Sequence, residues 1–169
     1  VTLLVAAYNE AGCIEDKIRN SLALDYPADK LRLLFITDGS DDGTPEIIAR
    51  YPAVHLLHAA GRKGKTAALN RAMAHVSTPV VVFCDANTLL NGAAIRNIVK
   101  HYVDPATGGV AGEKRVAGNN ESGAEATEGI YWKYESFLKK MDAAFYSIVG
   151  AAGELFSIRT ELYAPVEEE

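Results

Sequence analysis

Residues 31–44 read Leu-Arg-Leu-Leu-Phe-Ile-Thr-Asp-Gly-Ser-Asp-Asp-Gly-Thr, an apolar run that ends in acidic residues and glycines. The run over 31–36 predicts a buried strand bounded by turn residues. In an open α/β sheet, ligands bind in the crevice beyond the carboxyl ends of the strands. A carboxylate there accepts hydrogen bonds from a base or a ribose, and glycines let the backbone approach the ligand. This stretch therefore predicts a nucleotide site at a strand end.

Predicted strands alternate with predicted helices outward from this stretch. Strands are predicted over residues 2–7 and 54–57, and also over 80–84, where an uninterrupted apolar run is typical of the centre of a parallel sheet. Apolar residues at helical spacing predict helices from Ile14 to Tyr26-Pro27, from Lys65 to Val76, and over 94–102. Thr44 is expected to be the N-cap of another helix, with Pro45 at its first position. The alternation implies βαβ units and a mostly parallel sheet flanked by helices.

The second part of the chain is less regular. It predicts a strand over 110–116, a Gly/Asn/Ser-rich loop over 117–124 and a strand over 155–158. Between the loop and the last strand, a longer helix is expected to carry Ile130, Tyr134, Leu138, Met141 and Phe145.

Length and composition suit one α/β domain with a sizeable core, at 169 residues and 49% hydrophobic content. The net charge of −5 gives no electrostatic reason to expect a nucleic-acid partner. Cys13 and Cys84 form no disulfide framework, so a reducing, cytoplasmic compartment is expected. No apolar stretch approaches the roughly 20 residues of a membrane helix. The chain begins inside a predicted strand and is expected to be a piece of a larger protein.

Two polar clusters follow the first two predicted strands. Tyr8-Asn9-Glu10 comes first, and its alternative interpretation is a helix cap in which Asn9 is the capping residue. The second cluster begins at Asp38. A turn followed by a helix cap would account for Asp42-Gly43-Thr44, but it leaves Asp38 without a role.

The third cluster, Gly61-Arg62-Lys63-Gly64-Lys65-Thr66, is a basic glycine loop that opens a predicted helix. Backbone N–H groups at a helix N-terminus, with a lysine beside them, suit a phosphate group. The cluster nearly matches the P-loop pattern, but Ala59 stands where the first glycine is required. The alternative interpretation, a solvated basic loop, is favoured for Arg62 and Lys63 and less so for Lys65.

The fourth cluster, Asp85-Ala86-Asn87, follows the apolar strand over 80–84. Two oxygen ligands two residues apart suit Mg²⁺ or Mn²⁺ held between the phosphates of a nucleotide. The alternative is a turn in which Asp85 bonds its own backbone. Each cluster is weak alone, but four of them in succession favour a ligand site.

In this order, segments 6–10, 38–44, 64–70 and 85–87 resemble the family 2 inverting glycosyltransferases, and segment 150–159 resembles the acceptor-side segment of membrane-bound polysaccharide synthases. The resemblance implies a GT-A fold, a Rossmann-like sheet flanked by helices. Residues 1–169 would form one truncated domain, with the donor half and the start of the acceptor half.

Roles follow from the resemblance for the residues that match the family motifs. Ala7, Tyr8 and Glu10 would line the base and ribose pocket, and Asp38 would bind the uracil edge. Gly64 and Lys65 would lie near the pyrophosphate. Asp85 and Asn87 would bind the ribose, the diphosphate and Mg²⁺ or Mn²⁺, although Asn87 brings no charge where the family has a second aspartate.

The resemblance also implies a UDP-sugar donor, a glycan or lipid-linked acceptor, and inversion at the transferred sugar. The family's general base belongs to an acidic motif that would follow the segment near Pro165, and residues 167–169 do not match that motif. No catalytic residue is therefore assigned, and the chain alone is expected to be inactive. The parent protein is expected to be membrane-embedded, with this domain on the cytoplasmic face, or a soluble transferase. The alternatives are a P-loop ATPase and a nucleotide-sugar-binding module without turnover.

Overall fold

The computed structural model describes residues 1–113 and 154–166. Over these residues it contains one mixed sheet with the strand order β3-β2-β1-β4-β6-β5. The strands are β1 (Thr2–Ala7), β2 (Arg32–Asp38), β3 (His55–Ala59), β4 (Val80–Asp85), β5 (Gly109–Ala111) and β6 (Leu155–Arg159). The first four run parallel, whereas β6 pairs antiparallel with β4 and β5 antiparallel with β6.

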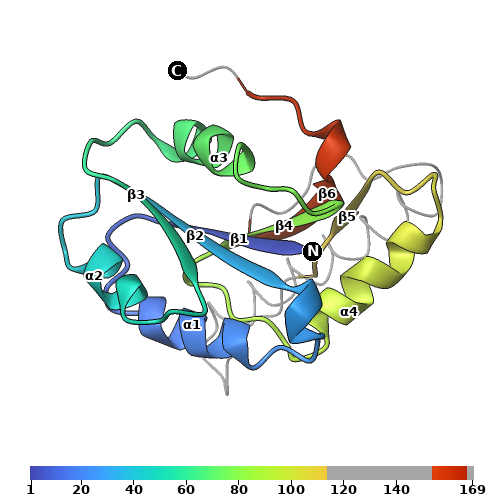
Figure 1. Cartoon of the computed structure of the whole chain (residues 1–169), viewed down its shortest axis with the longest axis horizontal. Helices are drawn as coiled ribbons and strands as arrows, with labels where there is room; N and C mark the ends of the chain where they lie inside the picture. The colour runs from blue at the N-terminus through green and yellow to red at the C-terminus, as the bar shows by residue number, and fades with distance from the viewer. Residues whose placement is uncertain (114–153, 167–169) are drawn as a thin grey trace, which may run out of the picture.

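Helices cover both faces of the sheet (Figure 1). One face carries α1 (Ile14–Leu22), α2 (Thr44–Ala49) and α4 (Ala94–Val99), and the opposite face carries α3 (Lys65–Met73). Short 3-10 turns lie at η1 (Ala28–Lys30), η2 (Lys100–Val103) and η3 (Thr160–Leu162). This three-layer arrangement is the one expected for βαβ units wound around a parallel sheet.

The core consists of two apolar clusters, one on each face of the sheet. Leu3 and Val5 of β1 pack with α1, α2 and α4, whereas Leu4 between them packs with α3. All three side chains are fully buried. Successive side chains of a strand point to opposite faces, so a strand covered on both faces must be apolar throughout. This requirement explains the unbroken apolar runs of the central strands.

The predicted mostly parallel sheet flanked by helices is confirmed, and the differences lie at the ends of elements. β2 continues through Asp38, so this carboxylate belongs to the strand. The first helix ends at Leu22, four residues before Tyr26. The prediction of Thr44 as an N-cap is wrong, because Gly43 is the cap, with φ +88°, and α2 begins at Thr44.

The ends of other elements also differ from the predictions. α3 ends at Met73 before Val76, and α4 gives way to η2 after Val99. Of the strand predicted over 110–116 only 110–113 is described, and there the structure has the short β5, which ends at Ala111. The loop predicted over 117–124, the helix predicted to carry Ile130 and Phe145, and the glycines of segment 150–153 lie outside the described residues. No helix among the described residues is long and apolar enough to cross a bilayer.

Candidate functional site

The strand order reverses between β1 and β4, because β2 and β3 lie on one side of β1 and β4 on the other. In open α/β sheets this reversal opens a crevice at the carboxyl ends of the strands. A cavity of about 310 Å³ lies there. It is lined by all the site residues that the sequence predicted: Ala7, Tyr8, Glu10, Asp38, Gly64, Lys65, Asp85 and Asn87.

Asp38 organises the floor of this cavity. It is the last residue of β2 and is only 5% exposed. Its Oδ2 accepts hydrogen bonds from the backbone N–H groups of Lys63 (2.6 Å) and Gly64 (2.8 Å). Its Oδ1 accepts one from the guanidinium of Arg71 at 3.1 Å, and Arg71 also donates to the carbonyl of Thr37.

These partners set the charge of the Asp38 carboxyl. Burial is the largest effect and by itself would raise the pKa, because it disfavours the charged form. The hydrogen bonds from the Lys63 and Gly64 amides and from Arg71 together outweigh burial and lower the pKa below its ordinary value. Asp38 therefore remains a carboxylate at neutral pH and acts only as an acceptor.

The basic glycine loop is folded around Asp38. The Lys63 and Gly64 amides at the start of α3, which a P-loop would offer to a phosphate, point to the aspartate. Gly64 holds φ at +96°, a left-handed conformation that favours glycine. This arrangement argues against the P-loop ATPase alternative, because these amides are already occupied.

Arg62 is exposed, as the interpretation as a solvated loop expects, and it also lines the cavity. Its guanidinium carbon is 3.8 Å from the centre of the Tyr8 ring, in cation–π geometry. The backbone of Gly39 approaches it so closely that a Cβ on Gly39 would lie 2.6 Å from the Arg62 Cβ. Gly39, with φ +72°, is therefore the residue that lets the two loops meet.

Opposite charges face each other at the end of β4. The ammonium of Lys65 lies 2.6 Å from Oδ1 of Asp85, whose side chain is 29% exposed. Asn87, two residues later, is exposed and lines the same cavity. No group of three or more His, Cys, Asp or Glu side chains within 1–113 and 154–166 is arranged to hold a metal ion. Asp85 and Asn87 offer oxygens suited to Mg²⁺ or Mn²⁺, provided that other ligands complete the shell.

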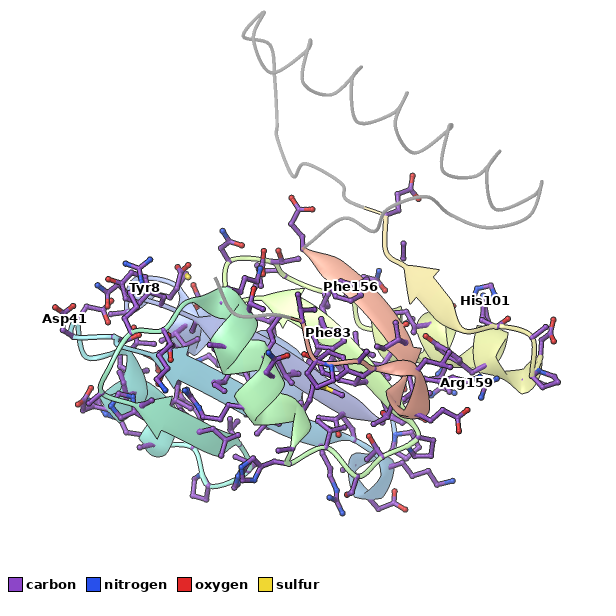
Figure 2. All side chains as sticks on the ribbon, turned by 90° about the horizontal axis from the view of Figure 1, so that it is seen from above. Tyr8, Asp41, Phe83, His101, Phe156 and Arg159 are labelled. Atoms are coloured by element: carbon purple, nitrogen blue, oxygen red, sulfur yellow. The ribbon has the colours of Figure 1, made fainter. Side chains whose placement is uncertain are left out.

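The loops after β1 and β2 are tied together by hydrogen bonds. Asn9 is the one non-glycine residue with positive φ among the described residues, and its side chain bonds both the side chain and the backbone of Asp41. Asp42 accepts from the Ala11 amide, and Thr44 from the Glu10 amide. Asn9 is thus not a helix cap, since α1 begins five residues later. Figure 2 shows Tyr8 and Asp41 together at one end of the molecule.

The side chain of Glu10 is held by a residue of its own loop. The thiol of Cys13 donates to its Oε2 at 3.1 Å. Burial first, and then the hydrogen bond to Glu10, raise the pKa of Cys13 to about 11. The thiol therefore stays protonated at neutral pH and continues to donate.

Comparison with known proteins identifies the family. The model for glycosyl transferase family 2 matches residues 2–165 of the chain. The chain belongs to this family. The poly-beta-1,6-N-acetyl-D-glucosamine synthase of Staphylococcus aureus is 33% identical over 120 residues, which are 69% of the chain and 29% of that protein. The chain thus spans about 29% of the length of the curated relatives that it matches.

Solved glycosyltransferases share the fold, which confirms the expected GT-A architecture. A mannosyltransferase from Pyrobaculum calidifontis, solved with GDP-Man and Mn²⁺, is 32% identical with a TM-score of 0.80 over 95% of this chain and 44% of its own. A glucosyl-3-phosphoglycerate synthase from Mycobacterium tuberculosis was solved with Mn²⁺, uridine-diphosphate and glucosyl-3-phosphoglycerate. It is 20% identical with a TM-score of 0.60, and the match covers 95% of this chain and 57% of that protein. At that identity the likeness shows the fold alone.

Sequence reasoning missed two arginines of the site. Arg71 lies in α3, 33 residues after Asp38, and no spacing in the sequence links them. Arg62 stands in a run of charged and small residues that reads as solvated surface. The signal that could have pointed to Arg62 is Gly39, since a glycine directly after a strand allows close approach of another backbone.

Proposed function

We propose that this chain binds a UDP-sugar together with Mg²⁺ or Mn²⁺, and that its parent protein transfers the sugar, with inversion, to a glycan or lipid-linked acceptor. The observation that carries the proposal is the convergence of the predicted donor-site residues on one cavity at the strand-order reversal. The family membership supplies the reaction class. We propose further that residues 1–169 form one domain.

The hydrogen-bond capacity of Asp38 supports uracil as the base. A carboxylate has about four lone-pair positions, and three are taken by Lys63, Gly64 and Arg71. One remains on Oδ1. Uracil presents a single N–H between two carbonyl groups, which one acceptor position satisfies, whereas guanine presents two adjacent donors. The ring of Tyr8, which is 40% exposed, and the guanidinium over it would cover a face of the base.

Charges at the end of β4 support the diphosphate and cation part of the proposal. Lys65 would turn from Asp85 to the diphosphate, and Asp85 and Asn87 would then hold the cation on the same phosphates. Both solved relatives described above contain Mn²⁺. When bound, the cation would stabilise negative charge on the departing diphosphate. The protein's own part is to orient the donor and to keep Lys65 beside it.

The acceptor and the location are proposed from the relatives alone. The matched staphylococcal enzyme is named as a synthase of a polymeric sugar, which supports a growing glycan as acceptor. The resemblance of segment 150–159 to the membrane-bound polysaccharide synthases supports a parent protein embedded in the membrane, with this domain on its cytoplasmic face.

Calorimetric titration of UDP into the protein with Mn²⁺ tests the donor site, with EDTA, GDP and ATP as comparisons. We expect UDP binding that depends on the cation and is lost in Asp38→Ala and Asp85→Ala. A preference for GDP would contradict the uracil assignment while preserving the transferase site. A preference for ATP that survives Asp38→Ala would overturn the proposed function.

A further inference from the structure

A lysine is buried beneath the turn that carries Asp85 and Asn87. Lys17 lies in the middle of α1, and its side chain is fully buried among apolar residues of the sheet face. None of the ion pairs among the described residues includes it. Burying an ammonium without a counter-charge is costly, and aliphatic residues would pack this position more favourably. Packing alone does not account for a lysine at this position.

The hydrogen bonds of Lys17 point to another reason. Its ammonium donates to the backbone carbonyl of Thr88 at 2.5 Å and to the sulfur of Cys84 at 2.9 Å. These two residues flank the turn over 85–87. The contact to the Thr88 carbonyl is the shorter of the two and is made to the better hydrogen-bond acceptor, because a cysteine sulfur accepts only weakly.

The turn itself is weakly closed. Its own backbone bond, from the Thr88 amide to the Asp85 carbonyl, is long at 3.3 Å, and the Asp85 amide meets the Glu154 carbonyl at the same distance. Neither Asp85 nor Asn87 is buried. Asp85 is held at the end of β4, where it pairs with Ala6, and by Lys65. The exposed Asn87 is therefore the oxygen ligand that depends most on a hold from outside the turn.

Helix α1 supplies that hold at two successive points. Besides Lys17 on Thr88, the side chain of Asn20, one turn further along the helix, donates to the Leu90 carbonyl and accepts from the Leu90 amide, both at 2.8 Å. Lys17 and Asn20 are three residues apart, so they lie on the same helix face. The helix thereby holds the segment that leaves the turn over 85–87.

We propose that Lys17 is a positioning residue for donor and cation binding, which acts by fixing the turn over 85–87 through the Thr88 carbonyl. The proposal rests on the proposed function, because it assigns Asp85 and Asn87 to the diphosphate and its cation. The buried charge also adds positive potential beneath the place expected for the diphosphate. A neutral side chain of the same length would fill the space and lose the hold.

The test compares Lys17→Met with the matched control Ile18→Val, a fully buried neighbour on the same helix whose side chain has no polar group to bond the turn. Hydrogen exchange of the unliganded protein, thermal unfolding, and calorimetric titration of UDP with Mn²⁺ are measured for each. We expect Lys17→Met to speed exchange of the Asp85, Thr88 and Leu90 amides, to weaken UDP binding about tenfold or more, and to leave the unfolding midpoint unchanged or higher. Ile18→Val should lower the midpoint and leave exchange in the turn and the affinity for UDP unchanged.

Two results would overturn the inference alone. One is unchanged exchange of the turn amides in Lys17→Met, and the other is faster exchange with undiminished affinity. A loss of affinity in Ile18→Val that matches the loss in Lys17→Met would show a general effect of stability and would likewise overturn it. Absence of UDP binding by the wild-type protein would overturn the proposed function and this inference with it.

Discussion

Asp38 joins stability and binding in one side chain, because it holds the glycine loop while its last acceptor position faces the cavity. Asp38→Asn would turn an N–H₂ group toward donors that are already present, and it leaves a buried amide or guanidinium unsatisfied. We expect a loss of about 1–3 kcal/mol in the free energy of unfolding, together with a loss of UDP binding. Urea denaturation and calorimetry measure the two effects. An intact loop with intact affinity would contradict the role of the carboxylate.

The same residue predicts a pH dependence. Its pKa in the folded state lies below the ordinary value of 3.8, so the folded state stabilises the charged form. That contribution is fully present above pH values near 3.8 and is lost as the pH falls through the lower folded pKa. The difference in unfolding free energy between the wild type and Asp38→Asn should therefore shrink between pH 5 and the acid limit of folding. A constant difference across this range would contradict the prediction.

Lys65 and a divalent cation would compete for one carboxylate, since Asp85 already pairs with the lysine. We expect Lys65→Met to bind Mn²⁺ alone up to about fivefold more tightly, a size set by the modest strength of exposed ion pairs. The same variant should bind UDP with Mn²⁺ more weakly, because the diphosphate loses its lysine. Lys63→Met is the matched control, since this lysine contributes its backbone and not its side chain. Parallel changes in both affinities would contradict the competition.

At this scale the sequence predicted which residues meet and left out how they are bonded. Asp38 was identified because an acidic residue at a strand end has no packing role, and Asp85 because it and Asn87 are two oxygen ligands two residues apart after a strand. The bond from Arg71 to Asp38 could not be predicted, because it depends on the angle at which α3 crosses the sheet. Lys65 was expected at the pyrophosphate. Its ion pair with Asp85 could not be predicted, because the sequence does not give the distance between the start of α3 and the end of β4.

Between elements, the contact of the loop after β2 with the loop before α3 depends on Gly39. An alanine there would be strained at φ +72°, at a cost of about 1–2 kcal/mol, and its Cβ would overlap Arg62. We expect Gly39→Ala to lose more unfolding free energy than this strain alone, and to weaken UDP binding as Arg62 leaves Tyr8. Urea denaturation and calorimetry again provide the measurements.

Gly43→Ala is the control for backbone strain without a clash. Its φ is +88°, and nothing lies within 4 Å of the added Cβ. This variant should lose about 1–2 kcal/mol and keep its affinity for UDP. Equal effects of the two substitutions would show that the approach to Arg62 has no influence on the site.

Elements were predicted well where burial alone decides them. β1 and β4 are covered on both faces, so their apolar runs mark strands without ambiguity. Helix ends were predicted less well, because distant partners influence them: beyond the end of α1, the Asp25 amide donates to the Gly92 carbonyl of another loop. The direction of β6 was equally hidden, since the short strand-like run predicted over 155–158 reads the same for parallel and antiparallel pairing.

The whole molecule carries a net charge of −5, and its cavity is lined by the acidic residues Glu10, Asp38 and Asp85 together with the basic residues Arg62 and Lys65. The acidic side chains outnumber the basic ones, so a diphosphate would need the divalent cation and Lys65 beside it. The groups that would touch the donor come from the ends of β1, β2 and β4 and from the start of α3. They are separated along the chain and adjacent only in the folded sheet, so the unfolded chain has no equivalent site.

It follows that the donor should stabilise the fold as a unit. A ligand that binds only the folded state at 100 times its Kd adds about 2.7 kcal/mol, which for a domain of this size raises the unfolding midpoint by about 5–10 °C. We expect UDP with Mn²⁺ to produce a single transition shifted by this amount, and UDP with EDTA or ATP with Mn²⁺ to produce much less. Asp85→Ala should remove the shift, because its carboxylate leaves the cation site. A shift of equal size with EDTA would contradict a bound cation, and a split transition would show that the donor contacts one part of the sheet and not the whole.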